Sequence, residues 1–220
     1  MKHGSPPHDQ RPRQARGAKT RAAILAAAGR VFAESGLAGA RTDAIAAVAG
    51  INKALLYYYF KSKEQLYLAV LEEQGQAFNR QAIALLTAPG SARTVLLRYA
   101  GLHFDFIRQR HRYATLHLQM MMAKGRLMEG LVRKFVVPRS QALGRLLERG
   151  MREGEFRRAD IRHTAISITA LIAFYFSIAP VLTMLGQADA CSEAALKRRR
   201  QEMLDFIRHG LFLEPKAPVP

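Results

Sequence analysis

The apolar positions of this 220-residue chain recur at spacings of three and four along most of its length. This period is typical of amphipathic helices, whereas an alternation of apolar and polar residues would indicate β-strands. No run of the chain shows that alternation. The pattern therefore predicts an all-α protein.

The N-terminal part of the pattern predicts two helices. Residues 18–35 are rich in alanine, carry apolar residues at helical spacing, and are followed by Gly36, which is typical of a helix end. A second helix is predicted over residues 42–49, with Ile45 and Val48 on its buried side. A threonine and an aspartate at its start suit a helix N-terminus.

A third helix follows after a short turn. Gly50 permits a left-handed backbone conformation, and Asn52 can cap a helix that runs to about Phe60. Two short helices joined by a glycine-containing turn are typical of a helix-turn-helix. Ser62 and Gln65 then form a capping box that opens a fourth, longer helix.

Residues 164–188 form the most apolar segment, with no charged side chain over 25 positions. The segment is long enough to cross a bilayer, but a helix covered on all sides by protein has the same composition. A membrane-tethered protein is therefore one alternative. A last helix is predicted over residues 192–211, with a stripe of apolar residues at helical spacing.

The composition is strongly basic, with 34 Lys and Arg against 17 Asp and Glu. Eleven of these basic residues and three of the acidic ones fall in the first 63 residues, where the short helices are predicted. Such a charge favours a polyanionic partner, nucleic acid before membrane. Cys191 is the sole cysteine, which excludes an intramolecular disulfide and suits a reducing cytoplasm.

Residues 51–66, INKALLYYYFKSKEQL, place three tyrosines in a row on the third helix. At 100° per residue, Leu56 and Phe60 share a face that can pack against the first two helices. Lys53 and Tyr57 share another, which we expect to face the major groove of DNA. A tyrosine suits the edge of a core as well as a phosphate, so the sequence alone leaves packing as an alternative for the run.

These residues resemble the DNA-binding domain of the tetracycline-repressor (TetR) family. The family pattern G-[VI]-[SN]-K-x-x-[LI]-Y-x-[HY]-F-x-[SN]-K-E-x-L fits the chain from Gly50 to Leu66. The resemblance implies a three-helix, helix-turn-helix DNA-binding domain followed by a helical ligand-binding and dimerisation domain. It also implies a homodimeric transcriptional regulator, here taken as a repressor, that binds a palindromic double-stranded operator and is released by a small, largely apolar effector.

The resemblance also implies roles for single residues. Lys53 and Ala54 would read base edges, Tyr59 and Lys63 would reach phosphate, and Tyr58 would pack within the domain. The predicted DNA-binding residues are Arg41, Thr42, Lys53, Ala54, Leu55, Tyr57, Tyr59 and Lys63.

Two positions depart from the family pattern. Histidine is frequent at the position of Tyr59, whose hydroxyl can still donate to phosphate. Leu55 replaces a small or hydroxylated residue, so a contact with a thymine methyl becomes possible there. Arg41 and Thr42 resemble the family's backbone-anchoring pair, and either could cap the second helix.

In the body, the resemblance implies dimerisation through the last two long helices. An effector pocket is expected near residues 91–128 and the uncharged helix, with His117 as the orienting polar group. The candidate effector-binding residues are Phe106, Tyr113, His117, Met120, Met121, Phe174 and Tyr175.

The predicted organisation is a disordered basic arm over residues 1–17, a DNA-binding domain over 18–63, and an effector-binding and dimerisation domain over 64–215. No short catalytic motif is present, so we expect no enzyme, no catalytic residue, no metal site and no cofactor. We expect the protein in the bacterial cytoplasm, at the nucleoid. The remaining alternative is a nonspecific basic nucleoid-associated protein.

Overall fold

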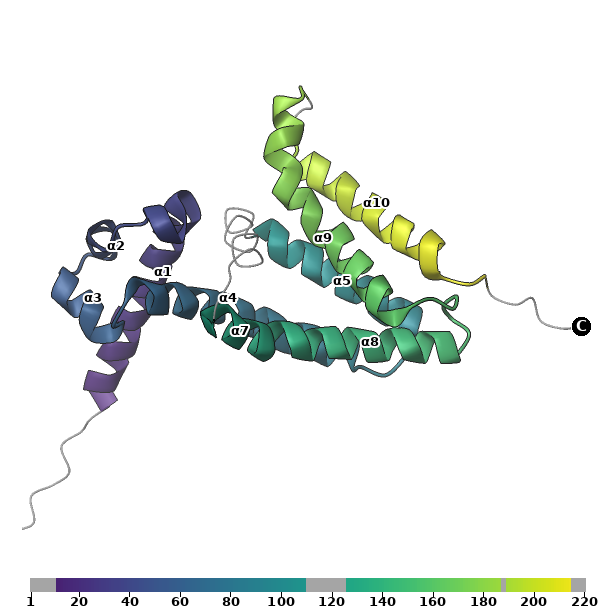
Figure 1. The fold of residues 1–220 in the computed structure, drawn as a ribbon, viewed down its shortest axis with the longest axis horizontal. Coiled ribbons are helices and arrows are strands. Elements are labelled where there is room, and N and C mark those ends of the chain that lie inside the picture. Colours follow the sequence, from purple (N-terminus) through teal and green to yellow (C-terminus); the bar gives the residue numbers. More distant parts are fainter. Residues whose placement is uncertain (1–10, 110–125, 187–188, 215–220) are drawn as a thin grey trace, which may run out of the picture. The chain divides into compact units, whose positions relative to one another are not determined.

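The computed structural model describes residues 11–109, 126–186 and 189–214, and these residues are helical with short connections (Figure 1). Within these ranges the structure contains no β-strand beyond one isolated bridge between Phe156 and Phe212. The prediction of an all-α protein is confirmed. The chain divides into two compact units, Met1–Leu71 and Glu72–Pro220, and the division falls inside one long helix.

The helices of the first unit are α1 (Arg11–Gly39), α2 (Thr42–Ala49) and α3 (Lys53–Tyr59), followed by the start of α4 (Lys63–Leu86). The second unit holds the rest of α4 and then α5 (Ala92–Gln109), α7 (Arg126–Leu131), a π-helical turn (Val132–Val136), α8 (Val137–Arg152), α9 (Ile161–Met184) and α10 (Glu193–Leu211).

Glycine and asparagine define the turns of the first unit. Gly36 has a φ of 65° and interrupts helical geometry inside α1, which agrees with the predicted stop. Gly50 ends α2 in the left-handed region at φ 66°, where a β-carbon would be strained. Asn52 caps α3 through its Oδ1, which accepts a hydrogen bond of 2.7 Å from the backbone nitrogen of Leu55.

The core of the first unit forms where these helices meet. Its fully buried side chains include Ile24 and Phe32 from α1, Ile45 from α2 and Leu56 from α3. Tyr67 at the start of α4 packs its ring edge-on to Phe32, with centroids 5.1 Å apart. The burial of Ile45 was predicted correctly.

Val48 was predicted as buried, but 48% of it is exposed. On the eight-residue α2 it lies three positions after Ile45. The small Ala46 takes the second buried position instead.

In the second unit, α5 is the central helix and packs against α8, α9 and α10. Its buried residues Tyr99 and Phe104 meet Leu147 of α8, Ile172 of α9 and Met203 of α10 in one apolar core. Each of these side chains is less than 2% exposed, so the body has its own core.

A residue in the connection between α8 and α9 caps the start of α5. The carboxylate of Glu155 accepts hydrogen bonds from the Ser91 hydroxyl at 2.6 Å and from the backbone nitrogens of Ala92 and Arg93, each at 2.9 Å. These nitrogens have no partner within a helix, so Glu155 supplies the cap from a distant part of the chain. Burial raises the pKa of the Glu155 carboxyl, but these hydrogen bonds outweigh it and lower the pKa below its ordinary value.

Candidate DNA-binding surface

The exposed face of α3 is the first candidate functional surface. Leu56 and Phe60 point into the core and are 0% and 5% exposed, as predicted. Lys53, Ala54 and Tyr57 lie on the exposed part of the helix. The side chains predicted to face DNA are therefore accessible on one short helix.

The three tyrosines of α3 occupy different environments, and one prediction about them is wrong. Tyr58 was expected to pack within the unit, yet 80% of it is exposed. It follows the buried Leu56 by two positions, or about 200° around the helix, so its side chain points away from the core. The family resemblance misplaced Tyr58, and the helix geometry accounts for its exposure.

Tyr57 and Tyr59 flank this exposed ring. Tyr57 is 40% exposed, and its hydroxyl lies 3.4 Å from the Thr42 hydroxyl at the start of α2. Tyr59 is half-buried, with its hydroxyl beside Gly17 of α1 and its ring edge-on to Tyr58. The two hydroxyls are thus presented from different sides of α3.

Lys53 forms an ion pair that the sequence analysis did not predict. Its Nζ lies 2.9 Å from Oδ1 and 3.0 Å from Oδ2 of Asp43 in the first turn of α2. The hydrogen bond from Lys53 lowers the pKa of the Asp43 carboxyl, against the opposing effect of desolvation. Both side chains remain about half exposed, so the pair is accessible to a competing polyanion.

The start of α2 was expected to be capped by Arg41 or Thr42. Arg41 occupies the capping position with an extended backbone, but neither side chain makes a capping hydrogen bond. Arg41 is exposed, and the Thr42 hydroxyl is directed to Tyr57 instead. Both side chains therefore lie at the edge of the surface formed by α3.

Lys63, predicted to reach phosphate, is bound to the protein itself. Its Nζ donates to the backbone oxygens of Ala38 at 3.3 Å, near the end of α1, and of Ala40 at 3.2 Å, in the turn between α1 and α2. The adjacent Ser62 caps α4 by accepting a hydrogen bond from the Gln65 nitrogen. Lys63 thus ties the start of α4 to the segment that precedes α2.

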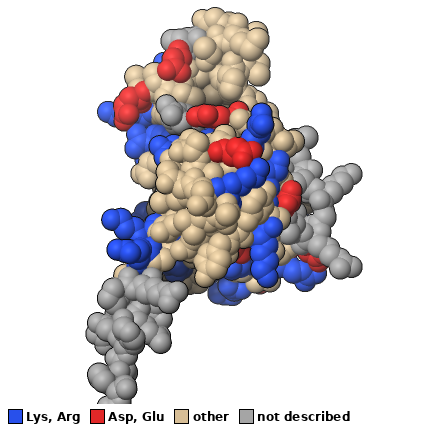
Figure 2. Space-filling model, turned by 90° about the vertical axis from the view of Figure 1, so that its left-hand side faces the viewer, with Lys and Arg blue, Asp and Glu red and all other residues tan. Residues whose placement is uncertain are grey.

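On one face of the molecule, charge is distributed rather than collected into one patch. On the face drawn in Figure 2, Lys and Arg side chains are spread widely and acidic side chains lie among them. The pairing of Lys53 with Asp43 is a local example. Binding to DNA on this surface has to rely on the arrangement of individual side chains as well as on net charge.

The predicted effector residues do not share one environment. Phe106 stacks on Phe78 within the second unit, with centroids 4.2 Å apart. Phe174 is 61% exposed on the outer side of α9, whereas the neighbouring Tyr175 donates to the backbone oxygen of Ala190. The other candidates, Tyr113, His117, Met120 and Met121, lie outside the described residues.

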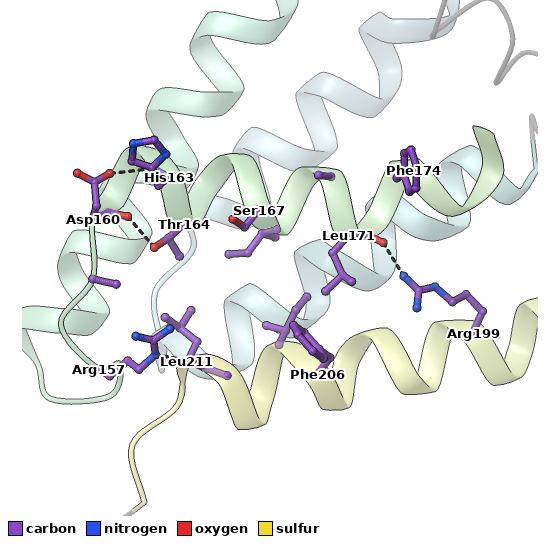
Figure 3. A pocket seen from close by; sticks show the side chains of 15 residues that line it. Arg157, Asp160, His163, Thr164, Ser167, Leu171, Phe174, Arg199, Phe206 and Leu211 are labelled. Carbon is purple, nitrogen blue, oxygen red and sulfur yellow. Dashed lines mark hydrogen bonds between the residues drawn. The ribbon is translucent and has the colours of Figure 1, made fainter. Parts of the chain in front are cut away.

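The structure does contain a groove between α9 and α10, of about 780 Å³ (Figure 3). The residues that line it are largely apolar and include Leu171 and the exposed Phe174 and Phe206. Arg199 lies at one end of the groove and donates to the backbone oxygen of Leu171 at 2.9 Å. Asp160 lies at the opposite end, where its carboxylate caps α9.

Apolar exposure continues along α9 beyond this groove. A second groove of about 1060 Å³ lies between α8 and α9. The exposed large apolar residues of α9, the residue after it and α10 are Ile166, Phe174, Val181, Met184, Leu185 and Phe206. By length and composition, α9 and residues 15–39 of α1 could each cross a membrane, a property that core helices of water-soluble proteins share.

Comparison with known proteins identifies both units. Residues 24–70 match the family of bacterial regulatory proteins described as the tetR family, and residues 93–207 match a tetracyclin repressor-like C-terminal domain. The chain is 30% identical over 197 residues to the HTH-type transcriptional repressor NicS of Pseudomonas putida. That match covers 86% of this chain and 89% of the repressor.

Solved structures share the fold. A putative transcriptional regulator of Saccharomonospora viridis in complex with choline aligns with a TM-score of 0.71 at 22% identity, over 90% of this chain and all of that one. The transcriptional regulator FadR of Bacillus subtilis in complex with stearoyl-CoA aligns with a TM-score of 0.68 at 20% identity, over 84% and 96% of the two chains.

Proposed function

Since the chain belongs to the tetR family of bacterial regulatory proteins, we propose that this DNA-binding transcriptional regulator reads its operator with the exposed face of α3. The observation that carries the proposal is the accessible set of Lys53, Ala54 and Tyr57 on α3, inside the region that matches the DNA-binding domain. A short helix with exposed polar and aromatic side chains fits the major groove.

Each residue of this surface has a proposed task. On binding, Lys53 leaves its ion pair with Asp43 and contacts base edges, as does the adjacent Ala54. Leu55 offers an apolar contact to a thymine methyl. Tyr57 and Tyr59 donate to phosphate. Tyr58, missing from the sequence-based set, joins the DNA-facing residues because its ring is exposed.

Three further residues support the surface from its edge. Arg41 and Thr42 anchor the start of α2 on the DNA backbone. Lys63 stays the proposed phosphate contact, and reaching phosphate would require it to exchange the carbonyl oxygens of Ala38 and Ala40. The functional division follows the start of α4, with residues 18–63 as the DNA-binding domain and 64–215 as the effector-binding and dimerisation domain.

Footprinting tests this proposal. We expect a palindromic operator and a loss of protection when Lys53 is replaced by alanine. Arg98→Ala on α5 is the matched control because it removes one positive charge from the second unit. Protection that survives Lys53→Ala and fails with Arg98→Ala would place the DNA-reading residues elsewhere.

We also propose that two copies pair through α9 and α10. Phe174 and Phe206 are 61% and 69% exposed in the single chain, and a soluble monomer rarely exposes so much contiguous apolar surface. Pairing of these helices across a two-fold axis would cover that surface. It would also give the dimer two α3 helices, one for each half-site of a palindromic operator.

Sedimentation tests the pairing. Phe206→Asp should convert a dimer to a monomer because it buries a charge in the interface. Gln201→Asp is the control, since Gln201 lies on the side of α10 away from the buried Met203. A Phe206→Asp chain that remains dimeric would remove α10 from the proposed interface.

The regulator is proposed to act as a repressor that a small effector releases, in the bacterial cytoplasm at the nucleoid and without enzymatic activity. Two observations support this. NicS, which this chain matches over 89% of its length, is a repressor, and two structural neighbours hold a small molecule, choline or stearoyl-CoA. The alternatives of a membrane-tethered protein or a nonspecific nucleoid protein are not favoured by these relatives.

A further inference from the structure

Two polar side chains are buried in the described part of the chain, and they lie in one cluster. Asn79 on α4 is 6% exposed and His103 on α5 is 2% exposed. Phe78 lies between His103 and Arg139 of α8. Its ring centroid is 4.9 Å from that of His103 and 5.2 Å from the guanidinium carbon of Arg139. Tyr99, 1% exposed, completes the cluster beside His103.

Arg139 brings a positive charge into this cluster. Its Nη1 donates to Oδ1 of Asn79 at 3.3 Å, and its guanidinium lies over the Phe78 ring. Burial raises the pKa of the Tyr99 hydroxyl and Arg139 only opposes this, so Tyr99 stays neutral and does not balance the charge. Within the described residues, Arg139 has no carboxylate partner.

The sequence strengthens this observation. Residues 110–125, between α5 and the continuous helical stretch that carries Arg139, contain no Asp or Glu. By contrast, Arg200 in the same unit pairs with Asp105, and Lys134 pairs with Glu72. A partly buried guanidinium without a counterion reduces stability, which is typical of a group kept for binding.

The neighbouring groups suit one ligand chemistry. A guanidinium offers paired N–H donors that match a carboxylate, and such pairs are stronger than neutral hydrogen bonds. Arg139 occupies the Asn79 oxygen, so the amide nitrogen of Asn79 remains a second donor. Phe78 and Phe106 stack at 4.2 Å and supply an apolar wall.

We infer that Arg139 and Asn79 bind the carboxylate of a small organic acid whose apolar part lies against Phe78 and Phe106. The inference rests on the proposed function, because it identifies the chemical class of the effector. Asn79 belongs to α4, which begins at Lys63 in the first unit. A carboxylate bound by Arg139 and Asn79 therefore contacts the helix shared by both units.

Calorimetry with paired probes tests the inference on the full chain. The probes are benzoate, phenylacetate and hexanoate, each compared with its neutral primary amide. We expect at least one acid to bind at least about tenfold more tightly than its amide. Arg139→Met should remove that preference, and Arg139→Lys, which keeps the charge without the paired donors, should leave only part of it.

Arg145→Met is the matched control, because Arg145 is an exposed arginine on the same helix. It should leave the preference of the chain for acids unchanged. If no acid binds more tightly than its amide, or if folded Arg139→Met keeps the preference, the inference is wrong. Should Arg139→Met fail to fold by circular dichroism, Arg139→Lys and Asn79→Leu decide, and an undiminished preference in both overturns it.

Operator binding without probe is measured on the same preparations. A chain that binds no operator but prefers acids through Arg139 would contradict the proposed function and leave the acid site standing. A chain that binds its operator and shows no preference for acids would support the proposed function and overturn the acid site.

Discussion

Replacing Leu56 or Tyr58 by alanine separates the core of α3 from its exposed face. Leu56 is 0% exposed, so Leu56→Ala removes a fully buried side chain and leaves a cavity that costs about 2–5 kcal/mol. Natural domains have only about 5–15 kcal/mol of stability, so the first unit would lose a large share. Tyr58 is 80% exposed, and Tyr58→Ala should change the free energy of unfolding by about 0.5 kcal/mol or less.

Urea unfolding followed by circular dichroism measures the two costs, and hydrogen exchange of peptides from α1 to α3 assigns them to the first unit. We expect Leu56→Ala to raise exchange throughout these helices and Tyr58→Ala to leave it unchanged while weakening DNA binding. A loss of more than about 1 kcal/mol on Tyr58→Ala would refute the outward placement of this ring.

Three further substitutions test other parts of the structure. Gly150→Ala would place a β-carbon 2.2 Å from Cδ2 of the buried Phe156, which should cost about 1–3 kcal/mol in thermal unfolding, whereas Gly210→Ala, with open space around it, should not. Because the pKa of Glu155 is lowered in the folded chain, its contribution to stability is present above its ordinary value of 4.5 and is lost as pH falls below it. Glu155→Gln should therefore flatten the acid limb of a plot of unfolding free energy against pH, and an unchanged limb would argue against this cap. Asp43→Asn frees Lys53, so binding to random DNA should tighten and the slope of log K against log salt should steepen by about 0.9 per protomer; an unchanged slope would mean that the pair does not limit phosphate contact.

Local sequence signals predicted the turns of the first unit well. Gly36, Gly50 and Asn52 act through their own backbone or side chain, so the residue type nearly determines the conformation. The helical period also separated Leu56 and Phe60 from Lys53 and Tyr57. These predictions needed no information about distant parts of the chain.

Contacts between elements were harder to predict. Lys53 and Asp43 stand ten positions apart, and only the turn between α2 and α3 brings them together. Lys63 could be read as a phosphate contact because the sequence does not show that the oxygens of Ala38 and Ala40 lie within its reach.

The effector region shows the same limit more strongly. Helical spacing gives no indication that Phe174 points outward while Tyr175 binds the Ala190 oxygen. The cluster of Asn79, His103 and Arg139 draws on three helices, and none of its members stands out in the sequence. A polar residue in a helical pattern becomes informative only when its burial is known.

The affinity of the chain for its footprinted operator and for random DNA, with and without Lys53→Ala, tests the central claim most directly. If α3 reads the operator, the wild-type chain protects a palindrome with half-sites about one helical turn apart, and Lys53→Ala costs roughly 1–3 kcal/mol on the operator and clearly less on random DNA. Equal losses on both DNAs, or the absence of a palindromic footprint, would contradict the assignment of α3 as the reading helix.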